Sequence, residues 1–124
     1  MERNIRLLIE YDGGRYDGWQ RLGKGHGVTI QGKLEDVLGK MTGEKIELIG
    51  AGRTDAGVHA YEQVANFHTN SQMKCWEMKY YLNRYLPGDI AVNRSAVLLC
   101  LRRYLYHRFH ARLICWFAYW NKML

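Results

Sequence analysis

The sequence predicts an α+β domain of the ferredoxin-like type, in which the order β-α-β-β-α-β builds an antiparallel sheet with two helices on one face, followed by an irregular C-terminal tail. Three observations support this prediction. Four segments show the apolar pattern of strands, two segments repeat apolar residues at helical spacing, and glycines or a proline stand between them. The 124 residues are enough for one domain with a core of its own.

The first strand is expected at residues 4–11, where Ile5, Leu7 and Ile9 recur at every second position. The segment 13–27 holds six of the 13 glycines and is expected to form a long mobile loop. A helix is expected over residues 29–42, because its apolar residues follow i, i+3, i+4 spacing. Thr29 stands where a residue would cap the start of that helix, and Gly43 stands where glycine ends it.

Two more strands are expected near residues 45–50 and 58–69, which are rich in β-branched and aromatic residues, with a short turn at 52–57 between them. A fourth strand is expected at residues 89–97. The inward positions of this fourth strand would be Ile90, Val92 and Ser95.

The second helix is expected between residues 73 and 88. Its apolar residues recur at Met78, Leu82 and Tyr85, with Trp76 and Tyr80 on a neighbouring stripe. Pro87, the only proline, ends it. After Val97 no period of either kind continues, so the tail has no predicted structure.

The net charge of +6 is unevenly distributed along the chain. Residues 1–89 contain all 12 acidic residues and 12 of the 18 basic ones, so this part is formally neutral and the whole excess lies in residues 90–124. A basic protein is often a partner of nucleic acid. Here the excess lies outside the regular part of the sequence, so the charge is weak evidence for such a partner.

The cellular setting is expected to be the cytoplasm. The three cysteines, an odd number, form no CxxC pair, which argues against the disulfide framework of a small secreted protein. No run of about 18 apolar residues is present, and the N-terminus carries charged residues too early for a signal peptide. Neither a membrane association nor secretion is expected.

The densest cluster of reactive residue types is the segment 50–60, where three glycines frame Arg53 and Asp55 on a turn between strands. A carboxylate beside a guanidinium stays ionised at neutral pH and is held in one orientation, as a nucleophile or a base must be. The alternative is structural: Asp55 would accept a hydrogen bond within its own turn, and Arg53 would be its surface partner.

Two other kinds of site are not favoured. The glycine spacing in segment 50–60 does not match a nucleotide-binding loop, because no GxGxxG or Gly-Lys-Ser/Thr pattern is present. No metal is expected either. His59 and His68 would lie on opposite faces of a strand, and His107 with His110 lacks a partnering carboxylate or cysteine pair.

The segment GAGRTDAGVHA at residues 50–60 resembles the catalytic-aspartate motif of the tRNA pseudouridine synthase A family, and the similarity covers residues 4–97 nearly continuously. Further landmarks of the family occur in the expected order. They are Tyr11-Asp12-Gly13, Gly18-Trp19-Gln20, Thr29-Ile30-Gln31, Val64-Ala65-Asn66-Phe67, Leu86-Pro87, Asp89-Ile90 and Phe109-His110-Ala111-Arg112. An ordered set of this kind is far more specific than an isolated Arg-Thr-Asp.

The resemblance implies an enzyme that isomerises uridine to pseudouridine at positions 38 to 40 of the tRNA anticodon arm. It also implies that neither a metal nor an organic cofactor takes part, and that the protein is a homodimer. The catalytic carboxylate would be Asp55, and the target base would have to leave its stack to reach it.

The resemblance, together with the chemistry of the residues, indicates which residues would contact substrate or RNA. They are Arg53, Thr54, His59, Trp19, Gln20, Arg15, Arg21, His110 and Arg112. Arg53 would orient Asp55, replace the flipped base or hold a phosphate, and the alternative is a purely structural ion pair. Arg15, Arg21 and Lys24 on the glycine-rich loop suit contacts with the RNA backbone, although a merely solvated loop is equally compatible. Trp19 and Tyr16 would stack on bases, or Trp19 would belong to the core.

The resemblance divides the chain into a catalytic half-domain at residues 1–97 and a divergent tail at 98–124 that keeps the Phe-His-Ala-Arg motif. Members of the family are about twice as long and have a second, similar domain, so we expect a truncated or frame-disturbed form. Two alternatives to the enzyme remain: an RNA-binding or assembly module that lacks catalysis, and a ferredoxin-like dimer with no role in RNA binding.

Overall fold

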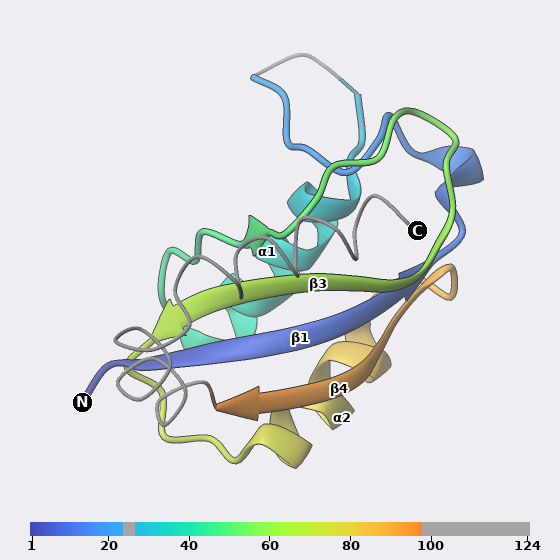
Figure 1. The fold of residues 1–124 in the computed structure, drawn as a ribbon. Helices are drawn as coiled ribbons and strands as arrows, with labels where there is room; N and C mark the ends of the chain where they lie inside the picture. The colour runs from blue at the N-terminus through green and yellow to red at the C-terminus, as the bar shows by residue number, and fades with distance from the viewer. Residues whose placement is uncertain (24–26, 98–124) are drawn as a thin grey trace, which may run out of the picture.

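The computed structural model describes residues 1–23 and 27–97. It confirms the predicted element order, which Figure 1 shows along the chain. The elements are β1 (Arg3–Tyr11), a 3-10 turn η1 (Gly13–Arg15), α1 (Ile30–Thr42), β2 (Ile49–Gly50), β3 (Ala60–Thr69), α2 (Cys75–Tyr85) and β4 (Ile90–Val97). The tail predicted to be irregular lies outside the described residues, as does the proposed boundary to a second segment at 98–124.

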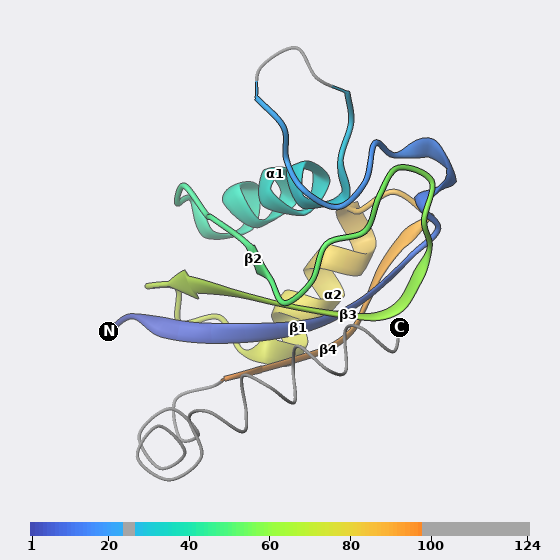
Figure 2. The same ribbon diagram turned by 45° about the horizontal axis from the view of Figure 1, so that its top comes forward.

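The four strands form one antiparallel sheet in the order β2-β3-β1-β4. Figures 1 and 2 show α1 and α2 packed on the same face of this sheet, which confirms the α+β ferredoxin-like prediction. The end of β1 lies beside the starts of both β3 and β4, because Tyr11 is paired with Ala60 on one side and with Ile90 on the other. The loops that enter and leave these strands therefore meet at one end of the sheet.

The core lies between the sheet and the two helices. On β1 the predicted alternation holds, since Ile5, Leu7 and Ile9 are fully buried. On β4, Ile90 and Val92 point into the core, and the register shift opposite Leu8 and Ile9 brings Ser95 to the same face. The Ser95 hydroxyl donates a hydrogen bond of 2.5 Å to the carbonyl of Cys75 on α2, so the predicted inward positions of this strand are confirmed.

The start and end of α1 follow the predicted chemistry. The Thr29 hydroxyl accepts a hydrogen bond of 3.2 Å from the Gly32 N–H, as an N-terminal cap does. Gly43 ends the helix at φ 71°, in the left-handed region that glycine enters without a steric penalty.

Helix α2 agrees with the prediction only on its inner face. Met78 and Leu82 are fully buried, but Tyr85 is 57% exposed, so its assignment to the apolar repeat is wrong. Tyr85 is the last residue of the helix, where the chain turns towards β4, and its ring packs on Tyr81 at a centroid distance of 4.5 Å rather than on the sheet. Within the two described ranges, no helix combines the length and apolar character needed to cross a bilayer.

Strand β2 is shorter than predicted, with two residues instead of six. Ile46 and Leu48 alternate as in a strand and are both buried, but side chains rather than a neighbouring strand satisfy the Leu48 backbone. The Glu35 carboxylate accepts from the Leu48 N–H at 3.1 Å, and the Gln31 amide donates to the Leu48 carbonyl at 2.8 Å. Strand β3 likewise begins at Ala60 rather than at residue 58.

The glycine-rich segment is anchored over its first half, contrary to the predicted mobile loop. Residues Gly13–Arg15 form a 3-10 turn whose start is capped by Asp12. Tyr16 and Trp19 are 5% and 2% exposed and belong to the core. Because two large rings of this segment are buried, its path from β1 to Trp19 is held by packing as well as by hydrogen bonds.

Candidate active site

Asp55 lies on the loop between β2 and β3, and its carboxylate is exposed. Among the described residues, no side-chain hydrogen bond or ion pair involves this carboxylate, although the backbone turn closes through a bond of 3.2 Å from the Val58 N–H to the Asp55 carbonyl. The structural alternative, in which the Asp55 side chain stabilises its own turn, is therefore not observed. The carboxylate remains open to a ligand from outside the described chain.

The predicted ion pair between Arg53 and Asp55 does not form. Both side chains are exposed, and no Arg53 nitrogen lies within 4.0 Å of a carboxylate oxygen in residues 1–23 and 27–97. The two residues are separated by Thr54, whose side chain is turned inward to Tyr11. Arg53 therefore does not orient Asp55 in this structure, and its guanidinium is presented to solvent.

Hydrogen bonds from the segment that follows β1 fix the backbone of the Asp55 loop. The Trp19 N–H donates to the Thr54 carbonyl at 3.0 Å, and the Gly57 N–H donates to the Tyr16 carbonyl at 3.2 Å. The Tyr11 hydroxyl lies 2.7 Å from that of Thr54. The exposed Asp55 carboxylate thus lies on a backbone that hydrogen bonds hold in place. A reacting group needs such a fixed position.

Close packing of the backbones requires two glycines beside this loop. A Cβ at Gly18, which has a φ of 92°, would lie 2.7 Å from the Thr54 carbonyl oxygen. At Gly50, a Cβ would meet the indole ring of Trp19 at 2.4 Å. Gly50 of the motif and Gly18 of the Trp19 segment therefore let the two segments approach each other, a packing role, while Asp55 stays at the surface.

Trp19 is placed in the core, which is the alternative that the sequence left open. Its ring stacks on that of Tyr11 with a centroid distance of 6.0 Å, and neither ring is accessible to a base in this structure. Trp19 also bridges to α1, because its carbonyl accepts from the Gln31 N–H at 3.0 Å. Gln20 is exposed and follows directly.

The two loop arginines expected to contact RNA both have partners within the chain. Arg15 donates to Asp89 through Nε at 2.8 Å and forms an ion pair with it through Nη2 at 2.7 Å. Arg21 pairs at 2.7 Å with Glu35, whose side chain is only 6% exposed. Lys24 lies outside the described residues, as do His110 and Arg112, so the structure does not place these three.

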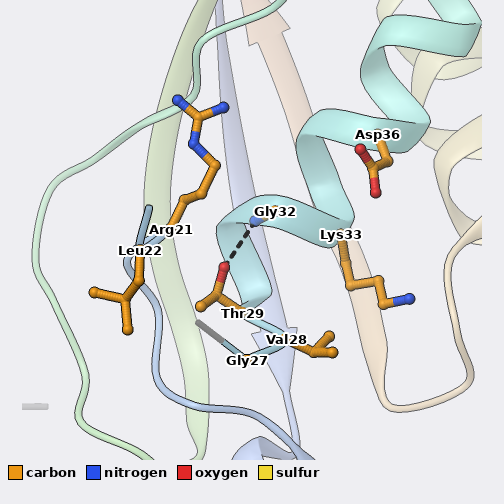
Figure 3. Close-up of a pocket in the computed structure, with 8 residues that line it drawn as sticks. All are labelled: Arg21, Leu22, Gly27, Val28, Thr29, Gly32, Lys33 and Asp36. Atoms are coloured by element: carbon orange, nitrogen blue, oxygen red, sulfur yellow. Dashed lines mark hydrogen bonds between the residues drawn. The ribbon is translucent and has the colours of Figure 1, made fainter. Parts of the chain in front are cut away.

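Arg21 also lines a pocket at the start of α1 that Figure 3 shows in close-up. The pocket contains Lys33 and Asp36 of α1 together with Thr29, whose bond to Gly32 is the dashed line in the figure. No residue of the Asp55 loop lines this pocket. Arg21 and Asp55 are consequently not brought together.

His59 is brought to a different pocket, at the end of the sheet where β1, β3 and β4 meet. Its Nδ1 accepts from the Gly13 N–H at 3.0 Å and lies 3.0 Å from Asp12 Oδ1. This pocket has a volume of about 530 Å³ and includes Tyr61 and Asp89. It is lined by Glu10, Tyr11, Asp12, His59, Ala60, Tyr61, Gly88, Asp89 and Ala91.

Asp89 is a supporting residue to which the sequence analysis gave no role. Its carboxylate accepts from the Tyr16 hydroxyl at 2.6 Å as well as from Arg15. Burial and the bond to Asp89 raise the pKa of Tyr16 to about 12. Burial alone would raise the pKa of Asp89, but hydrogen bonds from Tyr16 and Arg15 outweigh it and lower that pKa. The Asp89-Ile90 landmark was the only sequence signal for this position.

The described residues therefore form a ferredoxin-like domain that presents an aspartate, unpaired within these residues, on a well-anchored, glycine-framed loop. A protein-family model described as tRNA pseudouridine synthase matches residues 7–107. The chain belongs to this family.

Curated relatives agree with the family match. The chain is 55% identical over 109 residues to tRNA pseudouridine synthase A from Bacillus sp. (strain KSM-64), which covers 88% of this chain and 41% of the relative. It is 51% identical over 110 residues to tRNA pseudouridine synthase A 1 from Clostridium tetani, and the match covers 89% of this chain and 42% of that relative. It is 50% identical over 93 residues to tRNA pseudouridine synthase A from Acetivibrio thermocellus, and the match covers 75% of this chain and 37% of that relative. The chain thus spans about two fifths of the length of these relatives.

Proposed function

We propose that this chain carries the catalytic aspartate of a tRNA pseudouridine synthase and that Asp55 is that aspartate. The observation that carries the proposal is the exposed Asp55 carboxylate, which no described side chain or N–H engages, on a loop fixed by Tyr11, Tyr16 and Trp19. A structural aspartate would be satisfied within its own turn, whereas a reacting one must stay available to substrate.

The reaction we propose converts uridine to pseudouridine in the anticodon stem-loop, at positions 38 to 40. The bond between C1′ of the ribose and N1 of the uracil breaks, the base turns, and C1′ joins C5. The proton on C5 is lost, and N1 gains one, so the product is an isomer of the substrate. One ionised carboxylate near the ribose suffices for either of two roles, attack on C1′ or removal of a ribose proton.

The remaining parts of the proposal concern the substrate and the assembly. Arg53 would hold a phosphate or fill the space left by the flipped base, since its guanidinium has no ion pair among the described residues. We further propose that the protein acts as a homodimer on tRNA in the cytoplasm, without a metal or an organic cofactor.

The test is release of tritium from tRNA labelled at C5 of uridine, because the C5 proton leaves in this reaction. We expect release with the wild-type chain, background release with Asp55→Asn, and wild-type release with Glu47→Gln, an exposed carboxylate elsewhere on the surface. If the wild-type chain gives only background release while it binds tRNA, the chain is an RNA-binding module and the catalytic proposal is wrong.

A further inference from the structure

Helix α2 exposes large aromatic rings that are not part of the core formed by the described residues. Trp76, Tyr80 and Tyr85 are 66%, 65% and 57% exposed, although the inner face of the same helix is fully buried at Met78 and Leu82. Scattered exposed aromatics are ordinary, but three on a helix of eleven residues form a concentration typical of binding surfaces.

Basic side chains lie between these rings. Lys79 and Arg84 are exposed on α2, and Lys74 precedes its first turn. Residues 76, 80 and 84 are spaced by four, so they lie along one face of the helix, with Lys79 beside them. We call the six residues the α2 surface: Lys74, Trp76, Lys79, Tyr80, Arg84 and Tyr85.

The charge of the α2 surface is positive and is not neutralised within the described residues. Glu77 is the one acidic residue of the helix, and its carboxylate accepts from the Lys74 N–H at 2.9 Å as part of the helix start. None of Lys74, Lys79 and Arg84 takes part in an ion pair of residues 1–23 and 27–97.

Arg84 is already arranged next to aromatic rings. Its Cζ lies 5.9 Å from the centroid of Tyr85, and the neighbouring Tyr85 and Tyr80 hydroxyls raise the pKa of its guanidinium. A partner for this surface must therefore offer negative charge and flat faces together. RNA offers both, since phosphates pair with the cations and bases stack on the rings.

A second copy of this chain fits the surface poorly. A two-fold contact through α2 would place Lys74, Lys79 and Arg84 of each protomer against the same cations of the other. The position of the helix favours RNA as well. After Tyr85 the chain reaches Asp89, which binds Arg15 and Tyr16 beneath the Asp55 loop. The C-terminal end of α2 thus lies at the same end of the fold as the loop between β2 and β3, as Figure 1 shows.

We propose that the α2 surface is a second RNA-binding surface, which stacks unpaired bases of the substrate on Trp76 and Tyr80 and pairs its phosphates with Lys79 and Arg84. This inference rests on the proposed function, because it assumes an RNA substrate. In this proposal Asp55 acts on the reacting base, and the α2 surface, on the helix side of the sheet, binds a separate part of the same RNA.

The charge contribution is tested by fluorescence anisotropy with a labelled RNA hairpin that has the length and loop of an anticodon arm. The double variant Lys79→Gln plus Arg84→Gln should bind more weakly than the 124-residue wild-type chain and show a salt dependence shallower by about two, one for each lost phosphate contact. The control is Lys40→Gln plus Lys45→Gln, which removes two exposed cations elsewhere and should keep the wild-type salt dependence.

The stacking contribution is tested with Trp76→Ala plus Tyr80→Ala, which should weaken binding about tenfold or more, whereas Trp76→Phe should retain most of the affinity. These side chains are exposed, so circular dichroism should show an unchanged fold. If both double variants bind the hairpin as the wild type does, or if the wild type does not bind it, the RNA assignment of this surface is overturned.

Two further outcomes would assign the surface to another partner. Competition by polyglutamate as strong as by unlabelled hairpin would indicate an acidic protein. If either double variant lost a dimer that the wild type forms in sedimentation, but kept the wild-type affinity for RNA, the surface would instead mediate self-association. The proposed function fails separately, through absent tritium release with intact binding. Asp55→Asn should bind the hairpin like the wild type.

Discussion

The hydroxyl of Tyr11, a core residue on β1, lies 2.7 Å from the hydroxyl of Thr54, the residue directly before the candidate catalytic aspartate. This contact joins the end of β1 to the candidate active-site loop across 43 positions of sequence. Trp19 reinforces it, because its ring stacks on Tyr11 and its N–H donates to the Thr54 carbonyl. Two buried residues, Tyr11 through its hydroxyl and Trp19 through its backbone N–H, therefore fix Thr54 directly before Asp55.

The first prediction is that Tyr11→Phe lowers the free energy of unfolding by about 1 kcal/mol, because the hydrogen bond to Thr54 is lost while the packing of the ring is kept. Urea denaturation measures the change. Tyr61→Phe is the matched control, since the Tyr61 side chain is 80% exposed and should change stability little. Equal stability of the two variants would show that the contact contributes nothing.

The second prediction concerns the glycine that lets the Trp19 segment approach the loop. Gly18→Ala should lower the free energy of unfolding by about 1–3 kcal/mol, because φ is 92° and the added Cβ would lie 2.7 Å from the Thr54 carbonyl oxygen. Gly23→Ala is the control, since no atom lies within 4 Å of a Cβ there. Similar thermal stability of both variants would contradict the close approach.

The third prediction uses the absence of an ion pair between Arg53 and Asp55 in the described chain. Arg53→Ala should change the free energy of unfolding by less than about 0.5 kcal/mol, as expected for an exposed side chain. It should nevertheless weaken tRNA binding and make its salt dependence shallower by about one, if the guanidinium holds a phosphate. A clear loss of stability with unchanged binding would instead assign Arg53 a structural role.

Much of the fold could be predicted because hydrophobic periodicity is a local property. The inward residues of β1, the Thr29 cap and the Gly43 end of α1 each depend on residues a few positions apart. The length of β2 could not be predicted in this way. Leu48 has the pattern of a strand residue, but its N–H is satisfied by Glu35, 13 positions earlier on α1.

The sequence analysis missed the partners of candidate site residues because these partners are also far away in the sequence. Arg15 looked like a free loop cation, and only the fold shows that Asp89, 74 residues away, binds it. Glycine content suggested a mobile loop, yet burial of Tyr16 and Trp19 holds its first half. The motif drew attention to Asp55, whose catalytic role stays a prediction. Arg53 and Asp55 both face solvent and do not pair with each other, which their spacing in the sequence does not reveal.

The last prediction is a pH dependence that arises from Tyr16. The ordinary pKa of tyrosine is about 10, and in the folded chain burial and the bond to Asp89 raise the pKa of Tyr16 to about 12. The group therefore favours folding fully below pH 10, where both states are protonated. Between pH 10 and 12 the unfolded chain loses the proton first, so the stabilisation decreases as the pH rises.

Tyr16→Phe removes this titration and the hydrogen bond to Asp89 together. At pH 9 the variant should be less stable than the wild type, and the difference between them should shrink as the pH approaches 12. Tyr11, whose pKa is also raised by burial, contributes equally to both proteins and cancels in the comparison. Urea denaturation at several pH values measures the difference, and a difference that stays constant from pH 9 to 12 would contradict the role given to Tyr16.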